Sequence, residues 1–168
     1  GAGEELASAE AVIVKTQPEP AAGEAPSGLP AEAQEAEATS IAALLDTDWW
    51  QERARREGLR ALEPSRPESE RPGHYIRGQR SPFSGAEGMR MFCSEADPTQ
   101  VVLLVRYNER MRNTGDTAHG GALAAVFDHL LIQSAVLARP GSFILTASLN
   151  VEYLLPLPLP SVVVAEAT

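Results

Sequence analysis

The stretch NTGDTAHGGALAAVFDHLLIQSAVLA, residues 113–138, decides the fold of this chain. It opens as a loop of small and polar residues that ends in His119-Gly120-Gly121. From Gly121 the sequence is apolar at almost every position until Arg139-Pro140-Gly141, which predicts a helix over residues 121–138. A helix that is apolar on nearly all sides must be enclosed by protein, so we expect it at the centre of the core.

Strand patterns flank this helix on both sides. Before it, residues 89–93 and 101–108 are predicted as two strands, with apolar side chains alternating along the second. After it, residues 143–155 are predicted as one long strand and residues 161–168 as another, with three prolines between them that cannot join a strand ladder. This order of elements predicts an α+β fold in which an antiparallel sheet curls around the helix.

The rest of the chain is predicted to lie outside this core. Residues 1–38 are rich in Ala, Glu, Pro and Gly and are predicted to be a disordered acidic tail. Residues 39–88 are predicted to hold short helices and a Pro- and Gly-rich connector. The folded domain is therefore expected to cover residues 89–168.

Two short helices are predicted after the tail. Residues 51–60 are dense in Arg and Glu at helical spacing, which predicts a solvated helix face. Trp49 and Trp50 are expected to anchor the second helix on the core. The side chains that can cap the two helices are Ser40 for the first, and Asp46 or Thr47 for the second.

Composition excludes several classes of protein. The 168 residues are 43% hydrophobic and 22% charged, as in an ordinary globular protein. The net charge is −9, most of it in the acidic tail, so no nucleic-acid partner is predicted. Because Asp128 and His129 interrupt the longest apolar run, no transmembrane segment is predicted. The one cysteine, Cys93, leaves no internal disulfide, and neither a metal site nor a cofactor is predicted.

The start of the sequence leaves the compartment undetermined. It begins at Gly1 rather than Met, so we expect a longer natural N-terminus. Residues 1–38 lack the positive start and the apolar core of a secretory signal, and they are too acidic for a typical transit peptide. The cytoplasm is favoured over an organelle such as the mitochondrion.

The first candidate for chemistry is the predicted helix start at His119-Gly120-Gly121. Backbone N–H groups in the first turn of a helix have no partner within the helix, and the helix dipole is positive there. Glycines let another group approach that backbone closely. These properties predict a site for a carbonyl oxygen or an oxyanion, and the alternative is a tight turn into the helix that binds nothing.

The second candidate is Asp128, nine residues after His119 in the apolar helix. A buried carboxylate is costly unless it is paired or hydrogen-bonded, so its presence there favours a functional role. The alternative is that Asp128 faces a wet cleft or binds a loop N–H and only stabilises the fold. His129 is expected to be a structural or interface residue, and Thr146 taken alone would be a simple strand former.

Together these residues resemble the hotdog-fold acyl-CoA thioesterases. The resemblance rests on Asn113, His119-Gly120-Gly121, Asp128 and the stretch TASLNVEYLLP at residues 146–156. It covers residues 89–168 and is to the subgroup of bacterial phenylacetyl-CoA thioesterases and mammalian thioesterase superfamily members. It implies an antiparallel sheet wrapped around the central helix, and homodimers or homotetramers whose sheets join edge to edge.

The resemblance also implies roles for these residues. Gly120 would supply the N–H that polarises the thioester carbonyl, Asn113 would bind or orient that carbonyl, and His119 would shape the loop. Asp128 would be the nucleophile or the general base that activates water. Thr146 would position that water from the neighbouring side of the dimer cleft. The residues expected to contact the acyl-CoA substrate are Gly121, Arg112 and Asn150.

Three features depart from the family pattern. Gly115 lies four residues before His119, where some relatives place it three residues before. The chain ends at Thr168, where family members continue with two more strands, so we expect an incomplete sheet. No pair of basic residues for the CoA phosphates stands out, and the candidates are Arg110, Arg112 and Arg139.

The sequence therefore predicts an enzyme of fatty acid metabolism that hydrolyses acyl-CoA thioesters. One alternative is a non-catalytic hotdog protein that binds acyl groups or partner proteins. Another is a scaffold whose acidic tail and Arg/Glu-rich helix recruit other proteins. The buried carboxylate favours the enzyme, because a binding module has no need of one, whereas the missing strands favour the alternatives.

Overall fold

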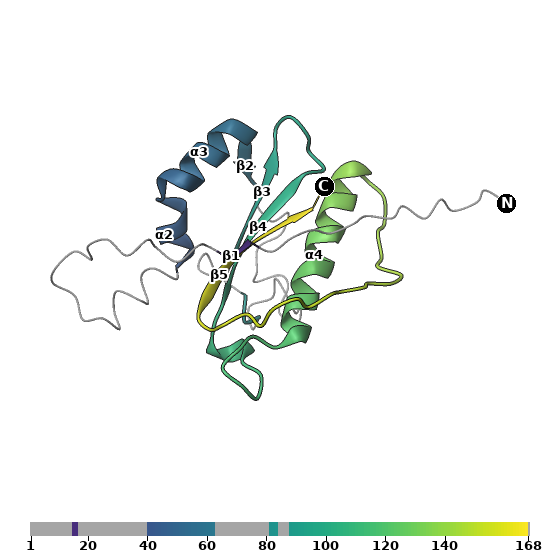
Figure 1. Ribbon diagram of the computed structural model, residues 1–168. Helices are drawn as coiled ribbons and strands as arrows, with labels where there is room; N and C mark the ends of the chain where they lie inside the picture. The colour runs from purple at the N-terminus through teal and green to yellow at the C-terminus, as the bar shows by residue number, and fades with distance from the viewer. Residues whose placement is uncertain (1–14, 17–39, 63–80, 84–87, 168) are drawn as a thin grey trace.

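The computed structural model describes residues 15–16, 40–62, 81–83 and 88–167. These residues form one antiparallel sheet in the strand order β1-β5-β4-β3-β2 (Figure 1). The strands are β1 (Lys15–Thr16), β2 (Leu59–Ala61), β3 (Met89–Ser94), β4 (Val101–Tyr107) and β5 (Ser161–Ala167). The helices are α2 (Ile41–Leu45), α3 (Asp48–Glu57) and α4 (Gly120–Ala138), with a 3₁₀ turn at Glu109–Met111. The predicted α+β fold is confirmed.

Strand β4 is the centre of the core and is buried on both faces. Val101 and Leu103 belong to the apolar cluster that includes Leu130 of α4. Val102 and Leu104 belong to a second cluster on the opposite face, with residues of α2 and α3. Helix α4 therefore covers one face of the sheet, and α2 with α3 covers the other (Figure 1). Each buried side chain of this kind contributes about 1.5–3 kcal/mol of hydrophobic stabilisation.

The predicted caps of the two short helices are present. The Ser40 hydroxyl accepts a hydrogen bond from the Ala43 N–H at 2.9 Å, and the Thr47 hydroxyl accepts one from the Trp50 N–H at 3.2 Å. Helix α3 ends at Gly58, whose φ of 58° is the left-handed conformation that glycine adopts without strain. The chain turns there and enters β2.

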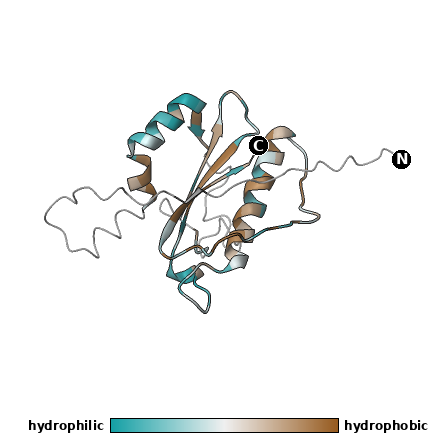
Figure 2. Cartoon of the chain, in the orientation of Figure 1, coloured by the Kyte–Doolittle hydropathy of each residue, from teal (hydrophilic) through white to brown (hydrophobic). Residues whose placement is uncertain are grey.

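One of the two tryptophans anchors α3, as predicted. Trp50 is buried and lies edge-on to Phe92 of β3, with ring centroids 5.0 Å apart. Trp49 is 50% exposed and lies 5.8 Å below the guanidinium of Arg53. Figure 2 shows that α2 is apolar, whereas α3 is largely hydrophilic.

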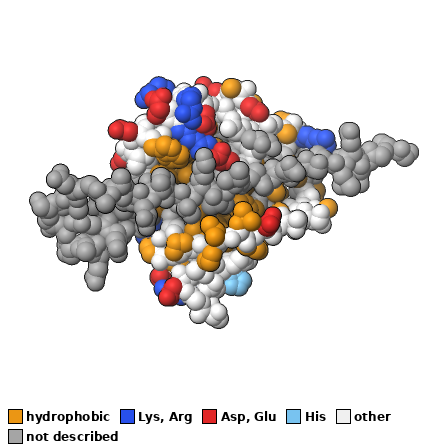
Figure 3. All heavy atoms as spheres, viewed as in Figure 1, with side chains coloured by type: hydrophobic (Ala, Val, Ile, Leu, Met, Phe, Trp, Pro, Cys, Tyr) orange, Lys and Arg blue, Asp and Glu red, His pale blue; other side chains and the backbone are white. Residues whose placement is uncertain are grey.

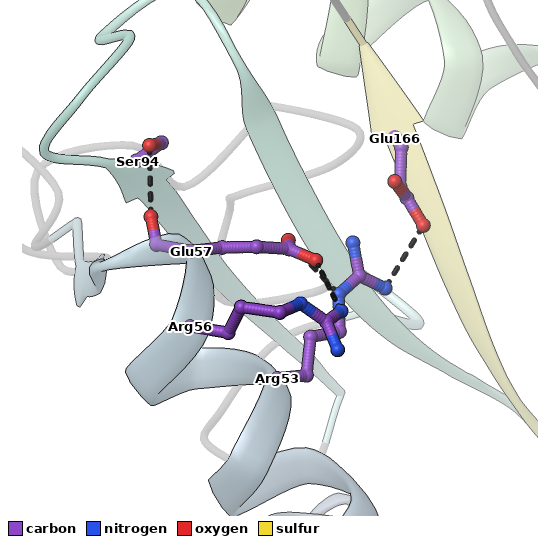
Figure 4. Close-up of polar contacts among 5 residues, drawn as sticks. All are labelled: Arg53, Arg56, Glu57, Ser94 and Glu166. Atoms are coloured by element: carbon purple, nitrogen blue, oxygen red, sulfur yellow. Dashed lines mark hydrogen bonds and ion pairs between the residues drawn. The ribbon is translucent and has the colours of Figure 1, made fainter.

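An ion-pair cluster ties α3 to β5 (Figure 4). The Arg53 guanidinium contacts Glu57 at 3.1 Å and Glu166 of β5 at 2.9 Å. Burial alone would lower the pKa of Arg53, but the hydrogen bonds to Glu166 and Glu57 outweigh it and raise that pKa above its ordinary value. The Ser94 hydroxyl donates to the Glu57 carbonyl at 2.9 Å, so the end of α3 is also attached to β3.

The predicted long strand over residues 143–155 is wrong. These residues, which we call the strap, run along α4 outside the sheet (Figure 1). Their alternating sequence suits a strand, but a strand forms only where a sheet edge accepts its hydrogen bonds, and β5 pairs with β4 and β1 instead. The strap is left largely exposed, with Phe143 87% and Leu155 84% accessible. In Figure 3, hydrophobic side chains gather on the face where the strap crosses α4.

Helix α4 is less enclosed than its composition predicts. Its buried apolar residues, Ala122, Val126 and Leu130, form one face against the sheet, whereas Val136 is exposed. The sheet packs against one face of the helix, and the strap contacts the helix without joining the sheet. Among the described helices, α4 is long and apolar enough to cross a membrane, but core helices pass the same test.

The N-terminal predictions are correct only in part. Lys15–Thr16, inside the predicted disordered tail, form β1 and pair with Val163–Val164 at the edge of β5. The remaining residues of the tail lie outside the described residues, as do residues 63–80 and 84–87 of the connector. The predicted solvated helix over residues 51–60 ends early, because Gly58 leads into β2.

Candidate active site at the start of helix α4

The first turn of α4 presents the predicted glycine pair. His119 is the N-cap, and its Nδ1 accepts a hydrogen bond from the Gly121 N–H at 3.0 Å. Because Nδ1 accepts, the neutral imidazole carries its proton on Nε2. Within the described part of the chain, the Gly120 N–H has no hydrogen-bond partner. The structure therefore leaves the Gly120 N–H open for a ligand and occupies that of Gly121.

Tyr153 of the strap lies over the same glycine pair. Its hydroxyl donates a hydrogen bond to the Gly120 carbonyl at 2.8 Å. A Cβ atom on Gly120 would lie 3.3 Å from the Tyr153 ring, and one on Gly121 would lie 3.0 Å from His119 Nδ1. Both glycines are therefore needed for these close approaches. The sequence gives no local signal for this contact, because Tyr153 and Gly120 are 33 positions apart.

Asp128 lies further along α4 and is held by the strap. The Thr146 hydroxyl donates a hydrogen bond to Asp128 Oδ1 at 2.5 Å. Asp128 is half-buried rather than fully buried, and Thr146 is exposed. Thr146 thus contacts Asp128 of its own chain, a contact that the sequence did not predict. The hydrogen bond and the partial exposure together lower the cost of placing a carboxylate on this apolar helix.

Gly120 and Asp128 do not converge within one chain. They are eight positions apart on one helix, which corresponds to about 12 Å along its axis and roughly 80° around it. The Asp128 side chain points away from the sheet-facing residues, toward the strap that carries Thr146.

Asn113 is occupied inside its own loop. Its Nδ2 donates to the Thr117 hydroxyl and its Oδ1 accepts from the Gly115 N–H, both at 2.6 Å. Its backbone N–H also donates to the Thr117 carbonyl at 2.9 Å. Both polar atoms of the Asn113 side chain are therefore engaged within the loop before α4.

Arg112 is likewise engaged, although it lines a pocket beside the helix start. Its guanidinium forms ion pairs with Glu109 and Asp116, so its charge is largely compensated. The pocket has a volume of about 340 Å³ and also includes His119 and Gly121. Arg110 lines the same pocket, whereas Arg139 is exposed at the far end of α4.

The remaining predicted site residue, Asn150, lies on the strap and is exposed. It has no hydrogen bond to the other residues that the structure describes. The described residues also contain no group of His, Cys, Asp and Glu side chains that could hold a metal ion. His129 is buried on α4 and Cys93 is buried in β3.

Comparison with known proteins gives a partial match. Residues 115–168 match the model of a family described as the thioesterase superfamily. No curated protein matches the chain. The matched region includes α4, the strap and β5, and so holds Gly120, Asp128, Thr146 and Tyr153, while Asn113 lies just outside it. The antiparallel sheet with α4 across one face is consistent with a hotdog fold. Over residues 115–168, about a third of the chain, the sequence is therefore similar to the thioesterase superfamily.

Proposed function

We propose that this protein hydrolyses acyl-CoA thioesters to the free acid and CoA. The observation that carries the proposal is the open Gly120 N–H at the start of α4 together with the Asp128 carboxylate, inside the region that matches a thioesterase family. Thioester hydrolysis needs a donor for the carbonyl oxygen and a group that activates water or attacks the carbonyl carbon. These two residues supply both.

In the proposed reaction, the Gly120 N–H donates to the thioester carbonyl oxygen and stabilises the negative charge that develops there. Asp128 takes a proton from water as the water oxygen bonds to the carbonyl carbon. The tetrahedral intermediate then collapses, the C–S bond breaks, and the CoA thiolate takes up the proton. In the alternative path, the carboxylate attacks the carbonyl carbon, the C–S bond breaks and the CoA thiolate leaves. Water then hydrolyses the resulting anhydride and supplies the proton that the thiolate takes up.

The spacing along α4 indicates that one reaction uses two copies of the chain. A hydrogen-bonded carbonyl and its attacking water span roughly 7–9 Å, less than the separation of Gly120 and Asp128 on one helix. We therefore propose a homodimer, or a tetramer made of two such dimers, in which Gly120 of one copy faces Asp128 of the other. Thr146 then lies with Asp128, across the cleft from the Gly120 that binds the carbonyl.

The strap supports this assembly. Exposed apolar side chains on one segment are typical of a surface that is covered by a partner. The exposed large hydrophobic residues of the strap are Phe143, Leu145, Tyr153, Leu154 and Leu155. A second copy of the chain is the partner that the proposed reaction requires.

Thr146 is proposed to act on the carboxylate rather than directly on the water. Its hydroxyl engages Asp128 Oδ1, so Oδ2 is the oxygen that faces the water. Asn113 keeps the loop in shape through its three hydrogen bonds within that loop. The pocket that Arg110 and Arg112 line is the proposed contact region for CoA.

The test is release of CoA thiol from acetyl-, octanoyl- and palmitoyl-CoA by the full chain. Asp128→Asn should lower kcat at least about 100-fold, the loss expected for a general base, with a Tm close to that of the parent. Asp97→Asn, in the exposed turn between β3 and β4, is the control and should leave kcat unchanged. A kcat of Asp128→Asn within about threefold of the parent would contradict the catalytic role. Acyl-CoA binding without turnover by the parent would support the non-catalytic alternative instead.

A further inference from the structure

We propose that Tyr153 is a positioning residue for the Gly120 N–H, an inference that rests on the proposed function. Tyr153 and His119 hold the two ends of the Gly120–Gly121 peptide group. The carbonyl of that peptide accepts from the Tyr153 hydroxyl at 2.8 Å, and its N–H donates to His119 Nδ1 at 3.0 Å. The peptide is therefore fixed at both of its polar atoms.

This peptide needs to be held because it joins two glycines in the first turn of a helix. Glycine has the widest range of backbone conformations, and the first turn lacks hydrogen bonds from its own N–H groups. The open N–H of Gly120 belongs to the preceding peptide group, His119–Gly120. This group shares the Gly120 Cα with the Gly120–Gly121 peptide that Tyr153 and His119 hold. The carbonyl of that preceding peptide, on His119, accepts from the Ala122 and Leu123 N–H groups at 2.9 and 3.3 Å. With both peptide planes held, the direction of the open N–H is set before a substrate arrives. A preorganised donor of this kind needs no rearrangement as charge develops on the carbonyl oxygen.

The ring of Tyr153 also bounds the approach to this N–H. A Cβ on Gly120 would meet Tyr153 Cζ at 3.3 Å, so the ring packs closely beside the glycine. Tyr153 is 52% exposed, so its outer side stays accessible to a molecule that reaches the N–H. The Tyr153 hydroxyl therefore holds the Gly120 backbone, and the Tyr153 ring limits the space beside it.

The strap carries both of the contacts that hold the proposed reactive groups. The Thr146 hydroxyl donates to Asp128, and the Tyr153 hydroxyl donates to Gly120. The two strap residues are seven positions apart, and their two partners on α4 are eight positions apart. One segment outside the sheet thus fixes the carboxylate and the N–H donor of the same chain. A substitution of Tyr153 should therefore alter the position of the Gly120 backbone without altering that of the Asp128 carboxylate.

The test compares the full chain with Tyr153→Phe, which keeps the ring and removes the hydroxyl. With octanoyl-CoA, we expect kcat to fall roughly 5–30-fold while KM stays within about twofold, because the donor remains but is less well aligned. The fall should be smaller than the roughly 10²–10³-fold loss that follows removal of such a donor. Glu152→Gln, at the neighbouring exposed position, is the matched control and should leave both constants unchanged.

A second measurement does not depend on activity. In protein labelled at glycine, Tyr153→Phe should shift the ¹³C resonance of the Gly120 carbonyl and speed hydrogen exchange at the Gly121 N–H, because the peptide is released at one end. Unchanged spectra at both sites would overturn the proposal, as would a raised KM with the parent kcat. If the parent chain hydrolyses no thioester, the proposed function fails, and the two spectra alone decide whether Tyr153 holds the peptide.

Discussion

Thr146 donates a hydrogen bond to Asp128 of its own chain, from the strap onto the middle of helix α4. The bond joins two segments that are 18 positions apart in the sequence. It engages one oxygen of the carboxylate, Oδ1. The hydroxyl therefore restricts the direction in which the carboxylate faces.

Two substitutions of Thr146 separate the effect of its hydroxyl from the effect of its size. Thr146→Val keeps the shape and removes the donor, so we expect kcat for acyl-CoA hydrolysis to fall about tenfold as the carboxylate loses its alignment. Thr146→Ser keeps the hydroxyl and should stay within about threefold of the parent. Because Thr146 is exposed, neither change should move the Tm by more than a few degrees. Equal rates for the two variants would show that the hydroxyl plays no part.

The Arg53 ion pairs lie on the face of the sheet opposite α4. A substitution of Arg53 should therefore change the stability of the fold and not the rate of hydrolysis. Arg53→Met should lower the free energy of unfolding by about 1–3 kcal/mol, less than for a fully buried pair, because Glu57 and Glu166 keep some contact with water. The rate of hydrolysis per folded molecule should not change. Urea denaturation of Arg53→Met, Glu166→Gln and the double variant measures the coupling. Additive losses would mean that the two residues do not interact in solution.

The short strand β1 predicts a local role for the N-terminal segment. Deleting residues 1–38 removes the pairing of Lys15–Thr16 with β5, which should cost about 1 kcal/mol or less because so few residues pair. Hydrogen exchange near Val163 and Val164 should become faster, because the edge of the sheet is uncovered. Hydrolysis should be nearly unchanged. A loss of most of the cooperative thermal transition would contradict this account of the tail.

Much of the core could be predicted from the sequence, because the deciding signals are local. The apolar run from Gly121 to Ala138 predicted α4, and the strand patterns at residues 89–93, 101–108 and 161–168 predicted β3, β4 and β5. The caps at Ser40 and Thr47 were readable because a cap and its helix are neighbours in the chain. The glycine pair at the start of α4 was readable for the same reason.

The strap was not predictable, because strand formation depends on a partner. Residues 143–155 have the alternation of a strand, yet β5 pairs with β1 and β4 instead. The roles of Tyr153 and Asn113 also depend on which segments the fold brings together. Asn113 is turned into its own loop, and Tyr153 is brought to Gly120, and neither outcome has a local signal.

The central claim is that Gly120 of one copy works with Asp128 of another, and mixed dimers test it most directly. Gly120→Pro removes the N–H at the first helical position, where proline is tolerated, and its Cβ also presses on the Tyr153 ring, so it should be as inactive as Asp128→Asn. When the two variants are unfolded together in equal amounts and refolded, half of the dimers carry one copy of each, and each mixed dimer holds one intact pair. We predict that the mixture recovers about a quarter of the parent kcat. A mixture as inactive as either variant alone would contradict the claim.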